Sequence, residues 1–137
     1  LARGIVVIME QGMIADTILH SAETSLGGLP ELAFINLMFW IEVGMSFFVP
    51  SSSGLAVLSM PILAPLADFA NVGRDLVVTA YQSANGLVNL INPTFAVVVG
   101  GLAIGRVSYD RWLAFIWPLL LILTVFITVV ISLGAML

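Results

Sequence analysis

Residues 49–68 read VPSSSGLAVLSMPILAPLAD, and this stretch decides how the apolar chain around it folds. Its beginning, residues 50–54, combines a proline, three serines and a glycine, which together form a strong helix breaker. Before the breaker, residues 31–49 are apolar enough to form one helical arm. The sequence therefore predicts two helical arms that meet at a polar tip.

The second arm, residues 55–67, carries Pro61 and Pro65 and has 13 residues. At about 1.5 Å per residue it would span only about 20 Å, less than the roughly 30 Å of a hydrocarbon core. Because an arm of this length cannot cross, both arms are expected to enter the membrane from one side. We therefore predict a re-entrant hairpin over residues 31–67, with its tip at residues 50–54 near mid-membrane.

The composition indicates that a bilayer surrounds these arms. Lys and Arg number 4 and Asp and Glu 8, so 9% of the 137 residues are charged, whereas 61% are hydrophobic. A soluble domain has roughly 25% charged residues. A net charge of −4 without any lysine excludes a nucleic-acid binder, and the absence of cysteine excludes thiolate sites. These observations predict an all-α integral membrane protein.

Three further segments complete the expected architecture. Residues 111–137 carry a single charge and form the clearest transmembrane helix. Residues 75–105 are expected to form a helix that breaks at residues 89–94, because Pro93 removes a backbone donor and disfavours helix in the residue before it. Residues 1–20 are expected to be the end of another transmembrane helix.

The beginning of the chain and its few charges suggest how it sits in the membrane. The chain starts at Leu1 inside an apolar run without a signal-peptide layout, so we interpret it as the C-terminal part of a longer chain. If the loop at residues 106–111 is cytoplasmic, three of the four arginines lie inside, whereas Glu23, Glu31, Asp68 and Asp75 lie outside, as the positive-inside rule favours. The C-terminus is then expected outside.

A serine-rich tip and a broken helix are the parts from which membrane carriers build solute sites. A helix start presents unpaired N–H groups and the positive end of the helix dipole, which can receive a carboxylate. We expect one half-helix to start at Gly54 and another at Thr94. The alternatives are an ordinary surface loop at the serines and a merely kinked helix at Pro93. The candidate solute ligands are Ser51, Ser52, Ser53, Gly54, Asn92, Pro93 and Thr94.

The break also offers oxygen ligands for a cation. Backbone carbonyls freed between Asn89 and Asn92 could coordinate Na⁺, and Tyr81, Asn85, Asn89 and Asn92 lie on one helical face. Asn85, Asn89 and Asn92 are therefore candidate ligands of a coupling ion, with interhelical hydrogen bonding as the alternative. Glu42, within the first arm, is either a proton carrier or a structural partner. The remaining ionisable candidates are Arg3, Glu10 and Asp16.

Several segments resemble a known family. Residues 49–68 resemble the YfcC-type carriers, which belong with the anaerobic C4-dicarboxylate carriers in the ion transporter superfamily. Residues 74–94, RDLVVTAYQSANGLVNLINPT, are similar to the broken helix of that family. ARGI at residues 2–5 and GMIADTILH at residues 12–20 resemble the segment before its hairpin. The resemblance therefore extends over nearly the whole chain.

This resemblance implies a secondary transporter of the bacterial inner membrane with two inverted repeats, of which this chain is the second, in a homodimer. The implied partners are the bilayer, the first repeat and a small carboxylate-bearing solute, either a C4-dicarboxylate or an amino acid. Transport would be coupled to Na⁺ or H⁺ or run by exchange, with no other cofactor and no enzyme activity. The alternatives are a basic amino acid or peptide antiporter of the same fold, a non-transporting scaffold, and an intramembrane serine hydrolase. The hydrolase would need a base for a tip serine, and His20 is the only histidine.

Overall fold

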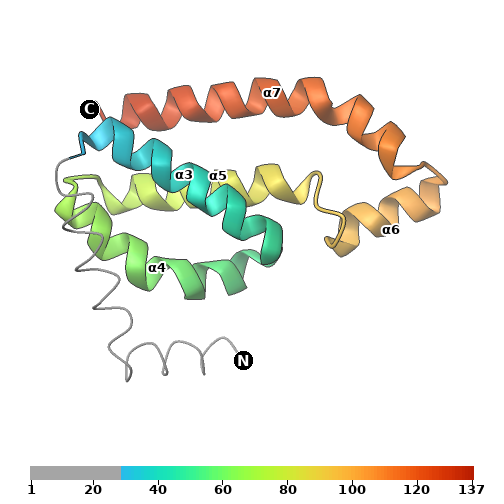
Figure 1. Ribbon diagram of the computed structural model, residues 1–137, viewed down its shortest axis with the longest axis horizontal. Coiled ribbons are helices and arrows are strands. Elements are labelled where there is room, and N and C mark those ends of the chain that lie inside the picture. The colour runs from blue at the N-terminus through green and yellow to red at the C-terminus, as the bar shows by residue number, and fades with distance from the viewer. Residues whose placement is uncertain (1–28) are drawn as a thin grey trace.

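Five helices follow one another in the part of the chain that this computed structural model describes, residues 29–137, and no strand occurs among them (Figure 1). The predicted helix end at residues 1–20, with Arg3, Glu10 and Asp16, lies outside the described residues. The five helices are α3 (Glu31–Phe48), α4 (Ser52–Phe69), α5 (Arg74–Asn89), α6 (Ala96–Gly105) and α7 (Tyr109–Gly134).

Three of these helices, α3, α4 and α7, are long and apolar enough to cross a membrane. The longest, α7, has 26 residues and continues through Pro118. Large apolar side chains such as Phe115, Ile122 and Phe126 are exposed along it, which is the surface expected of a helix that faces lipid or other apolar helices. The all-α membrane class predicted from composition is confirmed.

The second arm is longer than predicted, and the argument that it is too short to cross was wrong. Helix α4 has 18 residues, about 27 Å at 1.5 Å per residue, because Ser51 caps it and the helix starts directly at Ser52. Pro61 and Pro65 lie inside α4 without ending it. Each proline removes one donor, but buried leucines of the same helix hold it against the core. The length of this arm therefore does not establish a re-entrant hairpin.

Helix α3 lies at the centre of the packed core and contacts α4, α5 and α7. Its Ile35 and Phe39 are fully buried among apolar side chains of the neighbouring helices. The Asn36 amide also donates to the Ser132 hydroxyl of α7 at 3.0 Å. Helix α5 likewise contacts α3, α4 and α7, so the core is organised around the α3–α5 pair. The other core residues are Phe34, Met38, Leu63, Leu66, Ala67, Val72, Val77, Ala80, Ala84 and Ile131.

The two ends of the helix bundle differ in which segments they contain (Figure 1). The start of α3, the α4–α5 turn and the C-terminus gather at one end, and the α6–α7 turn lies at the other. In the α4–α5 turn the Arg74 guanidinium donates to both carboxylate oxygens of Asp68, at 3.0 and 2.5 Å, and Asn71 adopts a left-handed conformation with φ 55°. Arg106, with φ 52°, makes the turn at the opposite end. The hairpin turn between α3 and α4 lies at neither end but beside the α5–α6 break.

The helix break begins and ends later than predicted. Helix α5 continues to Asn89, and α6 begins at Ala96 after Phe95 as its N-cap. Thr94 was predicted to start the second half-helix, but it lies inside the break because its N–H and hydroxyl both bind the side chain of Asn92. This turn delays the first helical residue by two positions.

Candidate functional site

The hairpin tip presents three exposed serines at the start of α4. The Ser51 Oγ accepts a hydrogen bond from the N–H of Gly54 at 3.2 Å and lies 3.4 Å from the Ser53 Oγ. The expectation that Gly54 opens the helix with a free donor was therefore wrong, since Ser51 satisfies that donor. The N–H groups of Ser52 and Ser53 have no partner among the described residues. These two residues supply the free donors of the tip.

Asn92 ties the helix break to the end of α3. Its side chain is fully buried, and the Nδ2 donates to the Phe47 carbonyl at 3.0 Å and to the Ser46 carbonyl at 3.4 Å. The Oδ1 accepts from the N–H and hydroxyl of Thr94, at 2.9 and 2.7 Å. Both polar ends of one amide are thus used, and Pro93 and Thr94 remain exposed next to it.

A second connection holds the tip from α5. The Tyr81 hydroxyl donates to the backbone carbonyl of Ser52, and Tyr81 is buried. The tip is therefore bound to α5, and the residues just before the tip are bound to the break. The structure brings the predicted serine ligands and the predicted ligands Asn92–Thr94 into one region (Figure 1). That these residues bind a solute stays a prediction.

The three asparagines proposed for a coupling ion form part of a hydrogen-bond chain. Asn89 donates to the Oδ1 of Asn85 at 2.9 Å, and Asn85 donates to the Ser46 Oγ at 3.5 Å. The Oδ1 of Asn89 is buried without a partner among the described residues. The amides of Asn85 and Asn92 thus link helices, and the free oxygen in this group belongs to Asn89.

The first turn of α7 occupies two carbonyls that were expected to be free. The Leu90 carbonyl accepts from the Trp112 indole Nε1 at 2.9 Å, and the Ile91 carbonyl accepts from the Tyr109 hydroxyl. Neither Trp112 nor Tyr109 was predicted to contact the break. The sequence does contain a pattern that could have predicted these contacts. Two aromatic hydrogen-bond donors lie three positions apart at the start of a helix, and therefore on one helical face.

The aromatic donors of α7 give a testable prediction. Replacing Tyr109 with Phe or Trp112 with Phe removes one donor and leaves a half-buried carbonyl of the break unpaired. We expect each variant to lower the unfolding free energy by about 1 kcal/mol, seen as a lower thermal unfolding temperature in detergent. Trp117→Phe is the control, because this exposed residue donates no hydrogen bond to the described residues. If the two variants were as stable as this control, the hydrogen bonds from Tyr109 and Trp112 would not stabilise the break, and the prediction would be contradicted.

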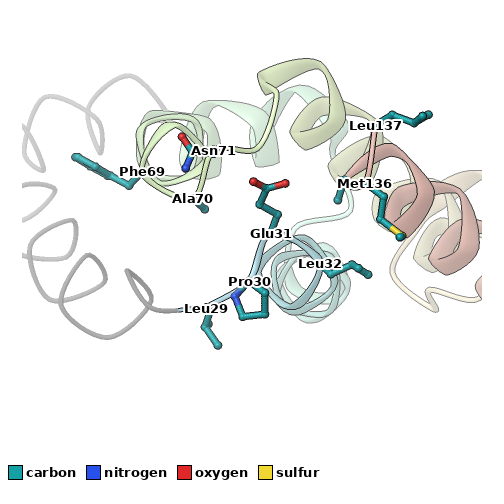
Figure 2. Close-up of a pocket in the computed structure, with 10 residues that line it drawn as sticks. Leu29, Pro30, Glu31, Leu32, Phe69, Ala70, Asn71, Met136 and Leu137 are labelled. Carbon is teal, nitrogen blue, oxygen red and sulfur yellow. The ribbon is translucent and has the colours of Figure 1, made fainter.

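A hollow of about 650 Å³ lies elsewhere, at the end of the bundle where α3 begins (Figure 2). The Glu31 carboxylate points into it between the end of α4 and the C-terminus. None of the predicted solute ligands lines this hollow. It is therefore separate from the site formed by the tip and the break.

Helices of this length and apolarity, with a polar tip that lies next to a helix break, are consistent with an α-helical membrane protein of the carrier type. The chain belongs to the DcuC family, described as C4-dicarboxylate anaerobic carrier, whose model matches residues 1–136. The family resemblance stated from the sequence is thereby confirmed, and it is a family of carriers rather than enzymes.

Two relatives add detail. An "Uncharacterized protein" of Haemophilus influenzae is 43% identical over 97% of this chain. The Escherichia coli protein named "Putative basic amino acid antiporter YfcC" is 36% identical over 82% of this chain. The alignments cover 27% and 23% of the relatives' own lengths, so this chain spans about a quarter of each. No solved structure matches the chain.

Proposed function

We propose that this chain is the second of two inverted repeats in a secondary active transporter of the bacterial inner membrane. The solute is a small molecule that bears a carboxylate, either a C4-dicarboxylate or an amino acid. The family description supports the first class and the name of the Escherichia coli relative supports the second. A carboxylate is common to both classes.

One observation carries this proposal: the α3–α4 hairpin is held on both sides of its turn by the segment that contains the helix break. Asn92 of the break binds the Phe47 carbonyl at the end of α3, and Tyr81 of α5 binds the Ser52 carbonyl in the tip. Irregular backbone at membrane depth persists only where protein or a polar cavity satisfies it. The proposal takes the hairpin to be re-entrant, which would put its tip and the unwound segment near mid-membrane, where carriers bind their solutes.

In this site the carboxylate is received by the start of α4. The free N–H groups and the hydroxyls of Ser52 and Ser53 are its donors, and the positive end of the helix dipole adds to the attraction. The exposed Pro93 and Thr94 border the same site from the break. A coupling Na⁺ would use the free Oδ1 of Asn89 and other oxygens of this region. The first repeat of the protein would contribute the opposite half of the site.

The orientation follows from the few charges. Placing the turn at Arg106 in the cytoplasm puts the C-terminus outside, together with the start of α3 and the α4–α5 turn. The protein is proposed to be a homodimer that works by alternating access, as the family resemblance implies. Large apolar side chains exposed on α7 are available to lipid or to a partner subunit.

Uptake by the full-length protein tests this function. Purified protein in liposomes is given labelled C4-dicarboxylates and basic and neutral amino acids, with gradients of Na⁺ or H⁺ or with unlabelled solute inside. We expect accumulation of at least one solute above protein-free liposomes, and competition by its close analogues. Accumulation of no carboxylate-bearing solute under any gradient would contradict the proposal and favour a non-transporting scaffold.

A further inference from the structure

The most unusual side chain in the described part of the molecule is that of Glu42, in the middle of α3. It is fully buried, and neither carboxylate oxygen has a hydrogen-bond partner there. The solute site described above does not include this residue. A carboxylate at this depth is costly unless it is paired, hydrated or protonated, so residues of this kind in membrane helices serve a function.

The groups that face Glu42 are polar but uncharged. Ser59 approaches it from α4 and Tyr81 from α5. The hydroxyl of Ser59 is also buried without a partner. Helix α7 is charged only in its first turn, at Asp110 and Arg111, and residues 112–137 contain no charge. The other acid of α3, Glu31, lies three turns away at the end of the bundle. Within residues 29–137 no cation is placed to neutralise this carboxylate.

We propose that Glu42 is a proton-binding site of this carrier and that it holds its proton in the packed arrangement seen here. A neutral acid can remain among Ser59, Tyr81 and apolar side chains, whereas an ionised one requires water or a cation. The reaction is a simple exchange: the carboxylate takes H⁺ from water on one side of the membrane and returns it to water on the other.

The position of Glu42 connects this proton to the solute site. Ser46 lies one helical turn further along α3, on the same face, and its carbonyl and hydroxyl accept from Asn92 and Asn85. Tyr81, which binds the carbonyl of Ser52 at the tip, also faces Glu42. Ionisation of Glu42 would favour separation of α3 from α4 and α5, because water must then reach the carboxylate. The proton therefore stabilises the arrangement in which the end of α3 is bound to the break and the tip is bound to α5.

Infrared difference spectroscopy on the full-length protein tests the proton directly and needs no solute. Spectra of the wild type at neutral pH are compared with those of Glu42→Gln, which preserves size and shape. We expect the wild type to show the C=O stretching band of a protonated, buried carboxylic acid and the variant to lose it. Glu31→Gln, which removes an exposed acid from the same helix, should retain the band. An unchanged carboxylic-acid region in Glu42→Gln would overturn the proposal.

A second measurement concerns coupling and rests on the proposed transport function. A transported solute is added to the protein in weakly buffered detergent solution, and the pH change is recorded. The wild type and Glu42→Asp should exchange protons with the solution when solute is added. Glu42→Gln should show no such proton exchange. It should still exchange labelled for unlabelled solute. Proton exchange at the wild-type level in Glu42→Gln would overturn the role of this residue. If no solute is transported by the wild type, the transport proposal fails, and the infrared result still decides whether Glu42 holds a proton.

Discussion

Asn92→Ala should abolish uptake by the full-length protein. The substitution removes the amide that binds the Phe47 and Ser46 carbonyls at the end of α3 and the N–H and hydroxyl of Thr94 in the break. Buried groups left unpaired cost about 1–3 kcal/mol each. A loss of about 3 kcal/mol at the contact between the end of α3 and the break corresponds to a roughly 100-fold decrease in transport rate. Initial rates in proteoliposomes, normalised to inserted protein, measure it.

Asn36→Ala is the matched control for this prediction. Asn36 also uses its amide to join two helices, since it donates to the Ser132 hydroxyl of α7, but this contact lies away from the tip. We expect both variants to unfold at a lower temperature than the wild type, and Asn36→Ala alone to retain most of the transport rate. Equal loss of transport in the two variants would show that general destabilisation is responsible, and full uptake by Asn92→Ala would contradict the role of the contact.

The elements of this fold were largely predictable because membrane helices have simple requirements. The long uncharged run predicted α7 correctly. The prolines and serines predicted helix interruptions close to those seen in the structure. The first residues of α4 and α6 were predicted wrongly, because at each start a side chain binds a backbone N–H group. Ser51 lets α4 begin at Ser52, and Asn92 holds Thr94 outside α6. Single capping bonds of this kind shift a helix start by two or three residues and have no periodic signature.

The candidate site was less predictable, because its hydrogen bonds join residues that are far apart in the chain. The sequence indicated which polar residues would lie at depth, but not that the Leu90 and Ile91 carbonyls are occupied by Trp112 and Tyr109. The pairing of Asn92 with Phe47 joins positions 45 residues apart. The sequence also does not predict that the Glu42 carboxylate lacks a hydrogen-bond partner, since this depends on which groups α4, α5 and α7 place around it. Contacts of this type follow from packing and not from local pattern.

The double variant Ser52→Ala, Ser53→Ala should lose solute binding while keeping its stability. Both side chains are exposed at the tip, and Ser51, which caps α4, is unchanged. A hydroxyl that donates to a charged carboxylate contributes about 1.5 kcal/mol or more, so the loss of two predicts a roughly 100-fold weaker affinity. Alanine is a better helix former than serine, and the thermal unfolding temperature without solute should stay the same or rise slightly.

Solute-dependent thermal stabilisation of the full-length protein separates these two effects, because a ligand that binds the folded state raises the unfolding temperature by an amount set by the ratio of its concentration to its Kd. The wild type should be stabilised by a transported solute, and the double variant should need a roughly 100-fold higher concentration for the same shift. Ser108→Ala is the control: this exposed serine precedes α7 at the opposite end of the bundle, and its side chain makes no capping bond. Asn92→Ala is expected to lose both stability and transport, whereas the tip variant should lose affinity alone. An unchanged affinity in the tip variant would place the solute away from the start of α4, and the helix dipole and serines would then have no part in binding it.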